Sequence, residues 1–207
     1  MTLARIEAVS GRAILPWLDD LAALRIRVFR EFPYLYDGSL AYERGYLADY
    51  AESERGLIVL ALAGNQVVGC STGLPLTEAA IEFRQPFVDA GPDPAEVFYF
   101  GESVLDAGFR GQGLGHRFFD EREAHAGRLG LKTTAFCAVL RPSDHPLRPT
   151  DYRPLDGFWT RRGYFRQPEL LASLAWKDLD QADETVKQLV FWLKPWPRSD
   201  RGRSIGP

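Results

Sequence analysis

The fold of this chain is decided by residues 103–115, which read SVLDAGFRGQGLG. An apolar run over residues 97–105 predicts a strand that leads into this stretch, and residues 113–130 have the pattern of an amphipathic helix that follows it. Glycines allow positive φ and let a ligand approach the backbone closely. The first amides of a helix are unpaired and lie at the positive end of its dipole. The stretch therefore predicts an anion site, and a pyrophosphate fits it.

Two better-known phosphate-binding patterns do not fit this stretch. A P-loop requires Gly-Lys-Ser/Thr after its second glycine, whereas Gly113 is followed by Leu114 and Gly115. A dinucleotide-binding unit requires G-x-G-x-x-G near the N-terminus, whereas this G-x-G-x-G spacing lies in mid-chain. The remaining alternative is a glycine-rich turn that binds nothing.

The pattern on either side of the glycines predicts a mixed α/β fold (α+β) with one largely antiparallel, mixed central sheet flanked by helices. Ser39 is positioned to cap a helix, and Gly64-Asn65 is a tight-hairpin signal. We expect a single domain over residues 1–195 and a flexible tail over residues 196–207. The expected helices are 15–30, 39–51, 113–130 and 156–162, and residues 77–90 form either a short helix or an irregular excursion. The expected strands are 57–63, 66–72, 97–105, 132–140, 170–177 and 185–193, and residues 3–9 form either a first strand or an extended arm.

The overall composition is that of a soluble globular protein. Of the 207 residues, 45% are hydrophobic and 26% are charged. The net charge of -3 lacks the basic excess that a nucleic-acid-binding protein needs, so no nucleic-acid partner is expected. The apolar run 57–63 is too short to cross a bilayer, so no membrane partner is expected. No secretory signal opens the sequence, which predicts a cytoplasmic location.

The cysteines and histidines do not form a metal-binding pattern. Cys70 and Cys137 both lie inside apolar, strand-like runs, which favours buried free thiols. The sequence has three histidines and no C-x-x-C spacing, so no metal is expected.

The glycine stretch resembles motif A of the GNAT N-acetyltransferase superfamily, which has Arg/Gln-x-x-Gly-x-Gly/Ala after an apolar strand. Residues 158–164, FWTRRGY, resemble a later segment of that family, and the element order resembles the GNAT fold along nearly the whole chain. The resemblance implies two strands that splay apart at a CoA site. It also implies an acetyl-CoA-dependent enzyme that acetylates a primary amine of a small molecule or peptide by direct attack in a ternary complex. The alternative is a GNAT-fold module that binds acyl-CoA with little or no catalysis.

The same resemblance implies roles for individual residues around the glycines. The amides from Gly111 to His116 would hold the CoA pyrophosphate, and the backbone of Val104 and Leu105 would pair with the pantetheine arm. An amide near Leu105 would polarise the thioester carbonyl, as in an oxyanion hole. The expected cofactor-binding set is Val104, Leu105, Arg110, Gly111, Gln112, Gly113, Leu114, Gly115 and His116.

Direct attack requires a neutral amine, so a base or a water chain must remove a proton. Glu102 is our candidate for this catalytic base, because it lies in the strand that leads into the glycine loop. A half-buried carboxylate at that position is expected to have a raised pKa. The alternative is that Glu102 faces solvent or pairs with an arginine for structural reasons.

The candidate for the proton donor departs from the family pattern. The family has a tyrosine in the late short helix, where this chain has Trp159, and an indole N–H does not act as an acid. The alternatives are Tyr152, Tyr164, Tyr99, Cys137 and protonation of the thiolate by water. Tyr164 aligns with an apolar family position, which favours a core role, and Cys137 has the pattern of a buried structural thiol.

The acceptor site is expected at the aromatic segment between the first two helices. Tyr34 and Tyr36 combine ring area with a polar group and suit a cationic amine, although the same rings are equally expected to pack the helix pair on the sheet. Arg141 and His145 follow the strand that ends near Leu140, where either CoA phosphates or solvent would meet them. The aromatic last strand offers a core face or a homodimer surface.

Overall fold

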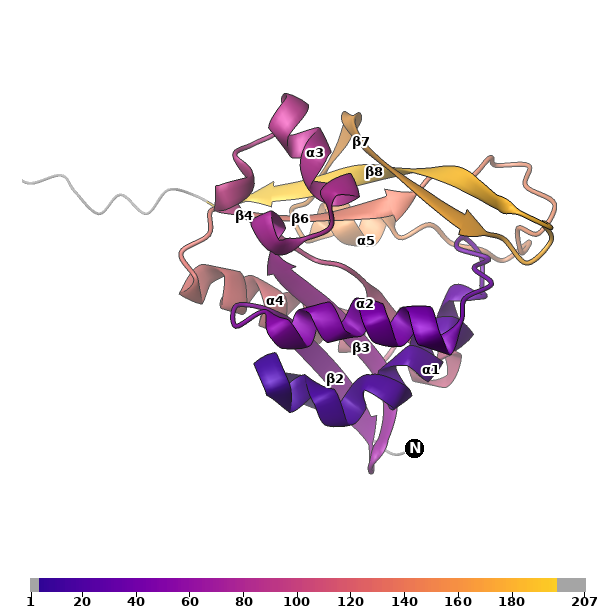
Figure 1. The fold of residues 1–207 in the computed structure, drawn as a ribbon. Helices are drawn as coiled ribbons and strands as arrows, with labels where there is room; N and C mark the ends of the chain where they lie inside the picture. The colour runs from indigo at the N-terminus through magenta and orange to yellow at the C-terminus, as the bar shows by residue number, and fades with distance from the viewer. Residues whose placement is uncertain (1–3, 197–207) are drawn as a thin grey trace, which may run out of the picture.

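The sheet has eight strands in the order β1-β2-β3-β4-β6-β8-β7, with β5 paired to β3 in addition. The computed structural model describes residues 4–196 (Figure 1). Every strand pair is antiparallel except β4 with β6, which confirms the mixed, largely antiparallel sheet. The strands are β1 (Arg5–Val9), β2 (Leu57–Ala63), β3 (Gln66–Pro75), β4 (Val97–Tyr99), β5 (Ser103–Leu105), β6 (Thr133–Val139), β7 (Phe165–Lys177) and β8 (Glu184–Pro195).

The helices pack on both faces of this sheet (Figure 1). Helices α1 and α2 cover one face, and α4 covers the other, with α5 beside it. Ser39 caps α2, as expected, because its hydroxyl accepts a hydrogen bond from the Tyr42 amide at 3.4 Å. Pro16 lies in a 3-10 turn, Gly11–Trp17, that precedes α1. The helices are α1 (Leu18–Phe29), α2 (Leu40–Glu52), α3 (Ile81–Ala90), α4 (Leu114–Arg128) and α5 (Asp156–Arg161).

The predicted continuous strand over residues 97–105 is wrong, because residues 100–102 interrupt it. The Gly101 amide donates to the Thr72 carbonyl at 3.2 Å, and the Thr72 amide donates to the Glu102 carbonyl at 3.1 Å, which gives an irregular, bulged pairing with β3. A Cβ at Gly101 would lie 2.3 Å from the Tyr50 hydroxyl, so glycine is required for this close approach.

This interruption separates two halves of the sheet. Strand β4 pairs with β6 up to Tyr99 and Ala135, whereas β5 pairs with β3 and makes no ladder with β6. Figure 1 shows the consequence: β2 and β3 run steeply down the view, while β6 and β8 run across it. A gap therefore opens between β5 and the second half of β6.

Side chains on the two strands that border the gap alternate between the two faces of the sheet. Val104 and Cys137 pack into the core beneath α1 and α2. Leu105, Phe136 and Ala138 pack with α4 and α5. Period-two alternation thus gives the gap two chemically different sides.

Two expectations at the C-terminal end differ from the structure. Strand β7 begins at Phe165 rather than residue 170, and its register shifts between Gln167 and Leu171, around a proline that has no N–H to donate. The expected tail over 196–207 lies outside the described residues except for Trp196, whose amide donates to the Lys132 carbonyl at 2.7 Å. Within residues 4–196, no helix has the length and apolar character needed to cross a membrane.

Candidate functional site

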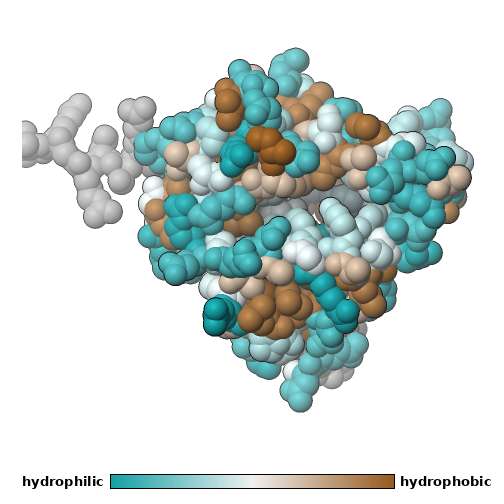
Figure 2. All heavy atoms as spheres, in the orientation of Figure 1, coloured by the Kyte–Doolittle hydropathy of each residue, from teal (hydrophilic) through white to brown (hydrophobic). Residues whose placement is uncertain are grey.

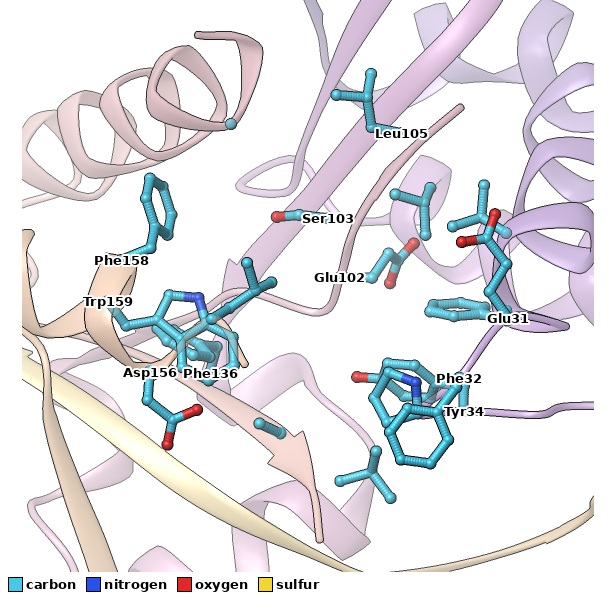
Figure 3. A pocket seen from close by; sticks show the side chains of 18 of the residues that line it. Glu31, Phe32, Tyr34, Glu102, Ser103, Leu105, Phe136, Asp156, Phe158 and Trp159 are labelled. Atoms are coloured by element: carbon cyan, nitrogen blue, oxygen red, sulfur yellow. The ribbon is translucent and has the colours of Figure 1, made fainter. Parts of the chain in front are cut away.

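A cavity of about 1350 Å³ occupies the gap between β5 and β6 and extends toward both faces of the sheet. Figure 2 shows the molecule hollowed between α1 and α2 on one side and β7 and β8 on the other. Inside the cavity, Phe158, Trp159 and Phe136 lie on one side, and Glu102 and Tyr34 lie on the other (Figure 3). The lining residues therefore form two opposite sides, as expected from the alternation of side chains along the two strands.

The glycine loop forms one end of this cavity. Gly111 and Gly113 have φ values of 75° and 80°, and α4 begins directly after Gly113. Within residues 4–196, the amides of Gly111 to Gly115 donate to no backbone or side-chain acceptor. These unpaired donors at the positive end of a 15-residue helix suit a diphosphate. The expectation requires a correction at His116, because its amide donates to the Gly113 carbonyl at 3.0 Å.

The side chains of the loop have separate roles. Arg110 lines the cavity, donates from Nε to the Leu105 carbonyl at 3.0 Å, and forms a two-pronged ion pair with Glu31 at 2.7 and 2.9 Å. Gln112 donates to the Gly108 carbonyl at 3.1 Å and does not line the cavity. The Leu114 side chain is buried in the core, so this residue has only its amide to offer a ligand.

The register of β5 decides which backbone groups face the gap. Hydrogen bonds from Thr72 to Glu102 and from Asp106 to Val68 place Val104 in a hydrogen-bonded pair with Cys70. The expectation that the Val104 backbone pairs with a ligand is therefore wrong, because its polar groups are directed at β3.

The same register directs the polar groups of Ser103 and Leu105 away from β3 and into the gap. The Leu105 carbonyl is taken by Arg110, which leaves the Leu105 amide free to face a ligand. The backbone at this end of the cavity thus offers the free edge of a strand.

Arg122 braces the interrupted strand from α4. Its side chain is buried and donates to the carbonyls of Thr72 and Glu102 at 3.1 and 3.0 Å and to the Ser103 hydroxyl at 2.7 Å. Burial lowers its pKa to about 10, so the guanidinium stays charged at neutral pH. Its charge lies over the Phe100 ring, 4.1 Å from the centroid.

Glu102 lines the cavity and is held in a buried ion-pair network. Its carboxylate pairs with Arg25, which also pairs with Glu43, and it accepts a hydrogen bond from the Tyr46 hydroxyl at 3.1 Å. Burial opposes a charge on Arg25, but Glu102, Tyr46 and Glu43 together raise its pKa well above the usual value. The arginine partner that the sequence analysis gave as an alternative is therefore present, and Glu102 also belongs to the lining of the cavity.

The side of the cavity next to α4 and α5 is aromatic. Phe136 lies 5.0 Å from Trp159 and 6.4 Å from Trp192, measured between ring centroids. Trp159 and Trp192 meet at 5.2 Å. The indole at position 159 is therefore packed among other rings, and this wall carries no acid at that position.

The sequence-based candidates for the proton donor lie in different places. Tyr164 is a core residue, because its hydroxyl bonds to Thr134 at 2.9 Å and to Glu123 at 3.0 Å. Tyr99 is buried and its hydroxyl lies 3.3 Å from the Cys137 sulfur. Burial raises the pKa of Cys137 to about 12, so its thiol stays protonated. Tyr152 lines the cavity.

The two tyrosines expected at the acceptor site are separated by the fold. Tyr34 lines the cavity on the side of Glu102 (Figure 3). Tyr36 does not line it: its ring packs on the Phe29 ring, with 6.5 Å between the ring centroids. The assignment of Tyr36 to the acceptor site is therefore corrected.

The two candidates that follow β6 act within the protein. Arg141 is not a solvated phosphate contact, because it is buried against Asp178 with ion-pair distances of 2.6 and 2.9 Å. It also donates to the carbonyls of Pro33 and Tyr34, both at 2.7 Å. His145 lies 5.8 Å from the Phe32 ring, so both residues support the segment that follows α1.

Sequence reasoning missed Arg122 and Arg25, although a signal was present. Arg122 lies four residues after Phe118 and four before Ala126, on the buried stripe of α4. Arg25 lies four residues after Leu21 on the buried stripe of α1. A charge on an apolar stripe must find buried partners, so this spacing predicts internal ion pairs or carbonyl contacts.

Comparisons with known proteins agree with this geometry. Residues 21–149 match the family described as the acetyltransferase (GNAT) family. No curated protein matches the sequence closely enough to count as a relative. Among solved structures, the fold is similar to a ribosomal-protein-alanine N-acetyltransferase from Brucella melitensis (13% identity, 92% of this chain and 99% of that chain covered, TM-score 0.58). It is also similar to an aminoglycoside 6'-N-acetyltransferase complexed with coenzyme A (16%, 95% and 99%, 0.59) and to an acetyltransferase from Thermus thermophilus (16%, 94% and 99%, 0.56).

Proposed function

We propose that this chain, which belongs to the acetyltransferase (GNAT) family, transfers an acetyl group from acetyl-CoA to a primary amine of a small molecule or peptide. The observation that carries this proposal is the combination of two features in one cavity. Five unpaired amides lie at the N-terminus of α4, and the free edge of β5 runs from there along the gap. A diphosphate followed by an extended, amide-bearing arm is the ligand chemistry that matches both.

The backbone of the gap is proposed to hold the acyl donor. The amides of Gly111 to Gly115 bind the pyrophosphate, and the backbone of Ser103 and Leu105 binds the pantetheine arm as an added strand. The Leu105 amide, which faces the gap, polarises the thioester carbonyl where negative charge develops. The aromatic wall around Trp159 excludes water from the thioester.

Glu102 is proposed to serve as the base, directly or through one water molecule. Glu102 lines the cavity on the side of α1 and α2, where an acceptor is proposed to approach the far end of the gap. The ion pair with Arg25 fixes the carboxylate in position, as a proton acceptor requires. The amine, once neutral, attacks the thioester without a covalent acyl-enzyme. Tyr34, on the same side, is proposed to contact the acceptor.

The assignment is tested by amine-dependent release of the free CoA thiol. The purified chain is supplied with acetyl-CoA and a panel of primary amines, and thiol release is followed together with the mass of the acetylated amine. We expect release with at least one class of amine and micromolar CoA binding by calorimetry. Absence of CoA binding would contradict the assignment.

A second candidate function, a module that binds acyl-CoA without turnover, is favoured by one observation. The indole of Trp159 occupies the family's tyrosine position and packs on Phe136 and Trp192. The same assay separates the two functions, because the module binds acetyl-CoA and releases no thiol with any amine.

A further inference from the structure

The departure at Trp159 leaves the proposed reaction without a proton donor on the wall formed by α5. Among the tyrosines of residues 4–196, Tyr34 and Tyr152 line the cavity. Tyr152 belongs to the loop between β6 and α5; its ring lies edge-on to Phe32 at 4.7 Å, and Arg148 lies 5.1 Å from its centroid. Tyr34 instead lies beside Glu102 across the cavity from Trp159 (Figure 3).

The Tyr34 side chain is held rigidly from both sides. Its ring lies 4.7 Å from Phe29 and 6.2 Å from Trp176, measured between centroids. Its carbonyl accepts hydrogen bonds from Arg141 at 2.7 Å and from the Trp176 indole at 3.1 Å. The next residue, Leu35, has a φ of 54°, which a leucine adopts only when its surroundings enforce it.

A buried cluster of charged side chains holds the Tyr34 segment in place. Asp178 is fully buried and accepts two hydrogen bonds from Arg141, and Lys187 lies 3.2 Å from the same carboxylate. Burial alone would raise the pKa of Asp178, but the hydrogen bonds from Arg141 and Lys187 lower it, so the carboxylate stays ionised. Asp178 follows β7 and Arg141 follows β6, so the cluster ties the Tyr34 segment to the sheet.

The Tyr34 hydroxyl is free to act on a ligand. It makes no hydrogen bond within residues 4–196, although its ring is packed on both sides. Burial raises its pKa, with the nearby Cys137 and Glu102 adding to the effect, so the phenol carries its proton at neutral pH. A rigidly held hydroxyl that has no partner of its own and faces a reaction cavity is placed to donate a proton to a ligand there.

We propose that the phenolic O–H of Tyr34 donates the proton that the sulfur of CoA takes up when it leaves, a role that rests on the acetyltransferase function proposed above. The amine nitrogen forms a bond to the thioester carbonyl carbon, and the C–S bond breaks with its electron pair on sulfur. Sulfur takes the phenolic proton of Tyr34. The nitrogen, now part of the amide, gives up one proton to the tyrosinate, which restores the phenol.

Arg141 is a positioning residue in this scheme, because it touches the Tyr34 backbone and its guanidinium is committed to that contact and to Asp178. Tyr34, in the segment after α1, supplies the acidic hydroxyl that the indole of Trp159 lacks.

The test compares two acyl donors in the Tyr34→Phe variant. With acetyl-CoA, kcat is expected to fall by about 100-fold, because a thiolate that leaves without a proton is a poor leaving group. With an aryl thioester, S-(4-nitrophenyl) thioacetate, the leaving thiolate needs no proton, and kcat/KM is expected to fall less than about threefold. The Kd for CoA, measured by calorimetry, stays unchanged. Loss of CoA binding or of turnover in the unmodified chain would instead count against the proposed function itself.

Two variants serve as comparisons. Tyr99→Phe removes another buried hydroxyl on the same face, outside the cavity lining, and is expected to leave the ratio of the two donors unchanged. In Tyr152→Phe, a selective loss with acetyl-CoA would assign the proton donor to Tyr152 and overturn the proposal. An equal loss with both donors in Tyr34→Phe, or no loss, would also overturn it.

A second measurement does not depend on removing the hydroxyl. Replacement Tyr34→3,5-difluorotyrosine keeps the ring and lowers the pKa of the phenol. We expect this replacement to bring a basic limb into the measurable range of the pH profile of kcat with acetyl-CoA, whereas burial keeps that limb at higher pH in the unmodified chain. A profile in which this limb does not move would show that the Tyr34 proton is not transferred.

Discussion

Arg122 donates a hydrogen bond from Nη1 to the main-chain oxygen of Glu102 at 3.0 Å. The same guanidinium bonds to the Thr72 carbonyl and the Ser103 hydroxyl, so it braces the point where the strand over residues 97–105 is interrupted. Arg122 lies on α4, the helix whose first amides form the proposed pyrophosphate site. One helix therefore links the donor-binding end of the cavity to the backbone that carries the candidate base.

Replacing this arginine with an apolar residue of similar length should damage both stability and turnover. Arg122→Met removes one of the two donors from each of the buried Thr72 and Glu102 carbonyls, which keep only the hydrogen bonds from the Gly101 and Thr72 amides. A hydrogen bond from a charged donor contributes about 1.5–3 kcal/mol, so the loss of two is expected to lower the free energy of unfolding by about 3–6 kcal/mol. Urea denaturation measures this change, and CoA-thiol release measures the accompanying loss of turnover.

The matched control for this change is Arg128→Met. Arg128 lies on the same helix but is exposed, so its replacement should change stability by less than about 0.5 kcal/mol. Equal stability losses in the two variants would show that the buried contacts of Arg122 do not brace the strand.

Glu102→Gln should reduce turnover more than it reduces stability. The amide keeps the size of the side chain but does not accept a proton from the amine, and loss of a general base typically costs about 100-fold or more in rate. CoA binding is expected to remain, because the donor-binding amides belong to α4 and the loop before it. The measurements are kcat for thiol release and the Kd for CoA.

Glu43→Gln is the control that separates chemistry from ion pairing. Glu43 shares the partner Arg25 with Glu102 and is fully buried, but it does not line the cavity. We expect its variant to lose stability and to keep most of its turnover. If both glutamine variants lost turnover equally, Glu102 would be a member of the ion-pair network and not the base.

Much of the fold could be predicted because its signals are local. The glycines and the helix period after them place α4 within a residue or two, and the Gly64-Asn65 turn fixes the β2–β3 hairpin. The break at residues 100–102 could not be predicted in this way. The run VFYFGESVL alternates and is apolar like one strand, and its interruption depends on Tyr50 and Thr72, which approach Gly101 from distant segments.

The candidate site shows the same limit. The backbone loop was predictable, since glycine spacing and a helix start are local features. The roles of Arg141 and Tyr36 were not, because both residues depend on Asp178, which the fold brings from a distant segment. Which amides of β5 face the gap also depends on the register of β5 with β3, because a shift of one residue turns each amide to the opposite side of the strand.

Gly113→Asp should abolish CoA binding without unfolding the protein. The substitution places a negative charge beside the phosphate-binding amides and a side chain at a φ of 80°, which non-glycine residues rarely adopt. Gly64→Asp is the control, because Gly64 also has positive φ (63°) but lies in the distant β2–β3 turn. Calorimetry with CoA should show binding in the Gly64 variant and none in the Gly113 variant. Equal CoA affinity in both would exclude the loop as the pyrophosphate site.

The two buried thiols should make the protein less stable in alkali. Burial raises the pKa of Cys137 to about 12 from a usual value near 9, and burial also raises the pKa of Cys70. The native state therefore keeps these protons to higher pH than the unfolded chain, and the free energy of unfolding falls as pH rises above 9. Between about pH 9 and pH 10 each thiol should account for a loss of about 1 kcal/mol, and the buried tyrosines, whose pKa values burial also raises, add to the fall as the pH nears 10. Urea denaturation at the two pH values measures the fall, and Cys137→Ser, whose hydroxyl does not titrate there, should reduce it by about 1 kcal/mol. An unchanged fall in that variant would mean that the Cys137 thiol is not held protonated by burial.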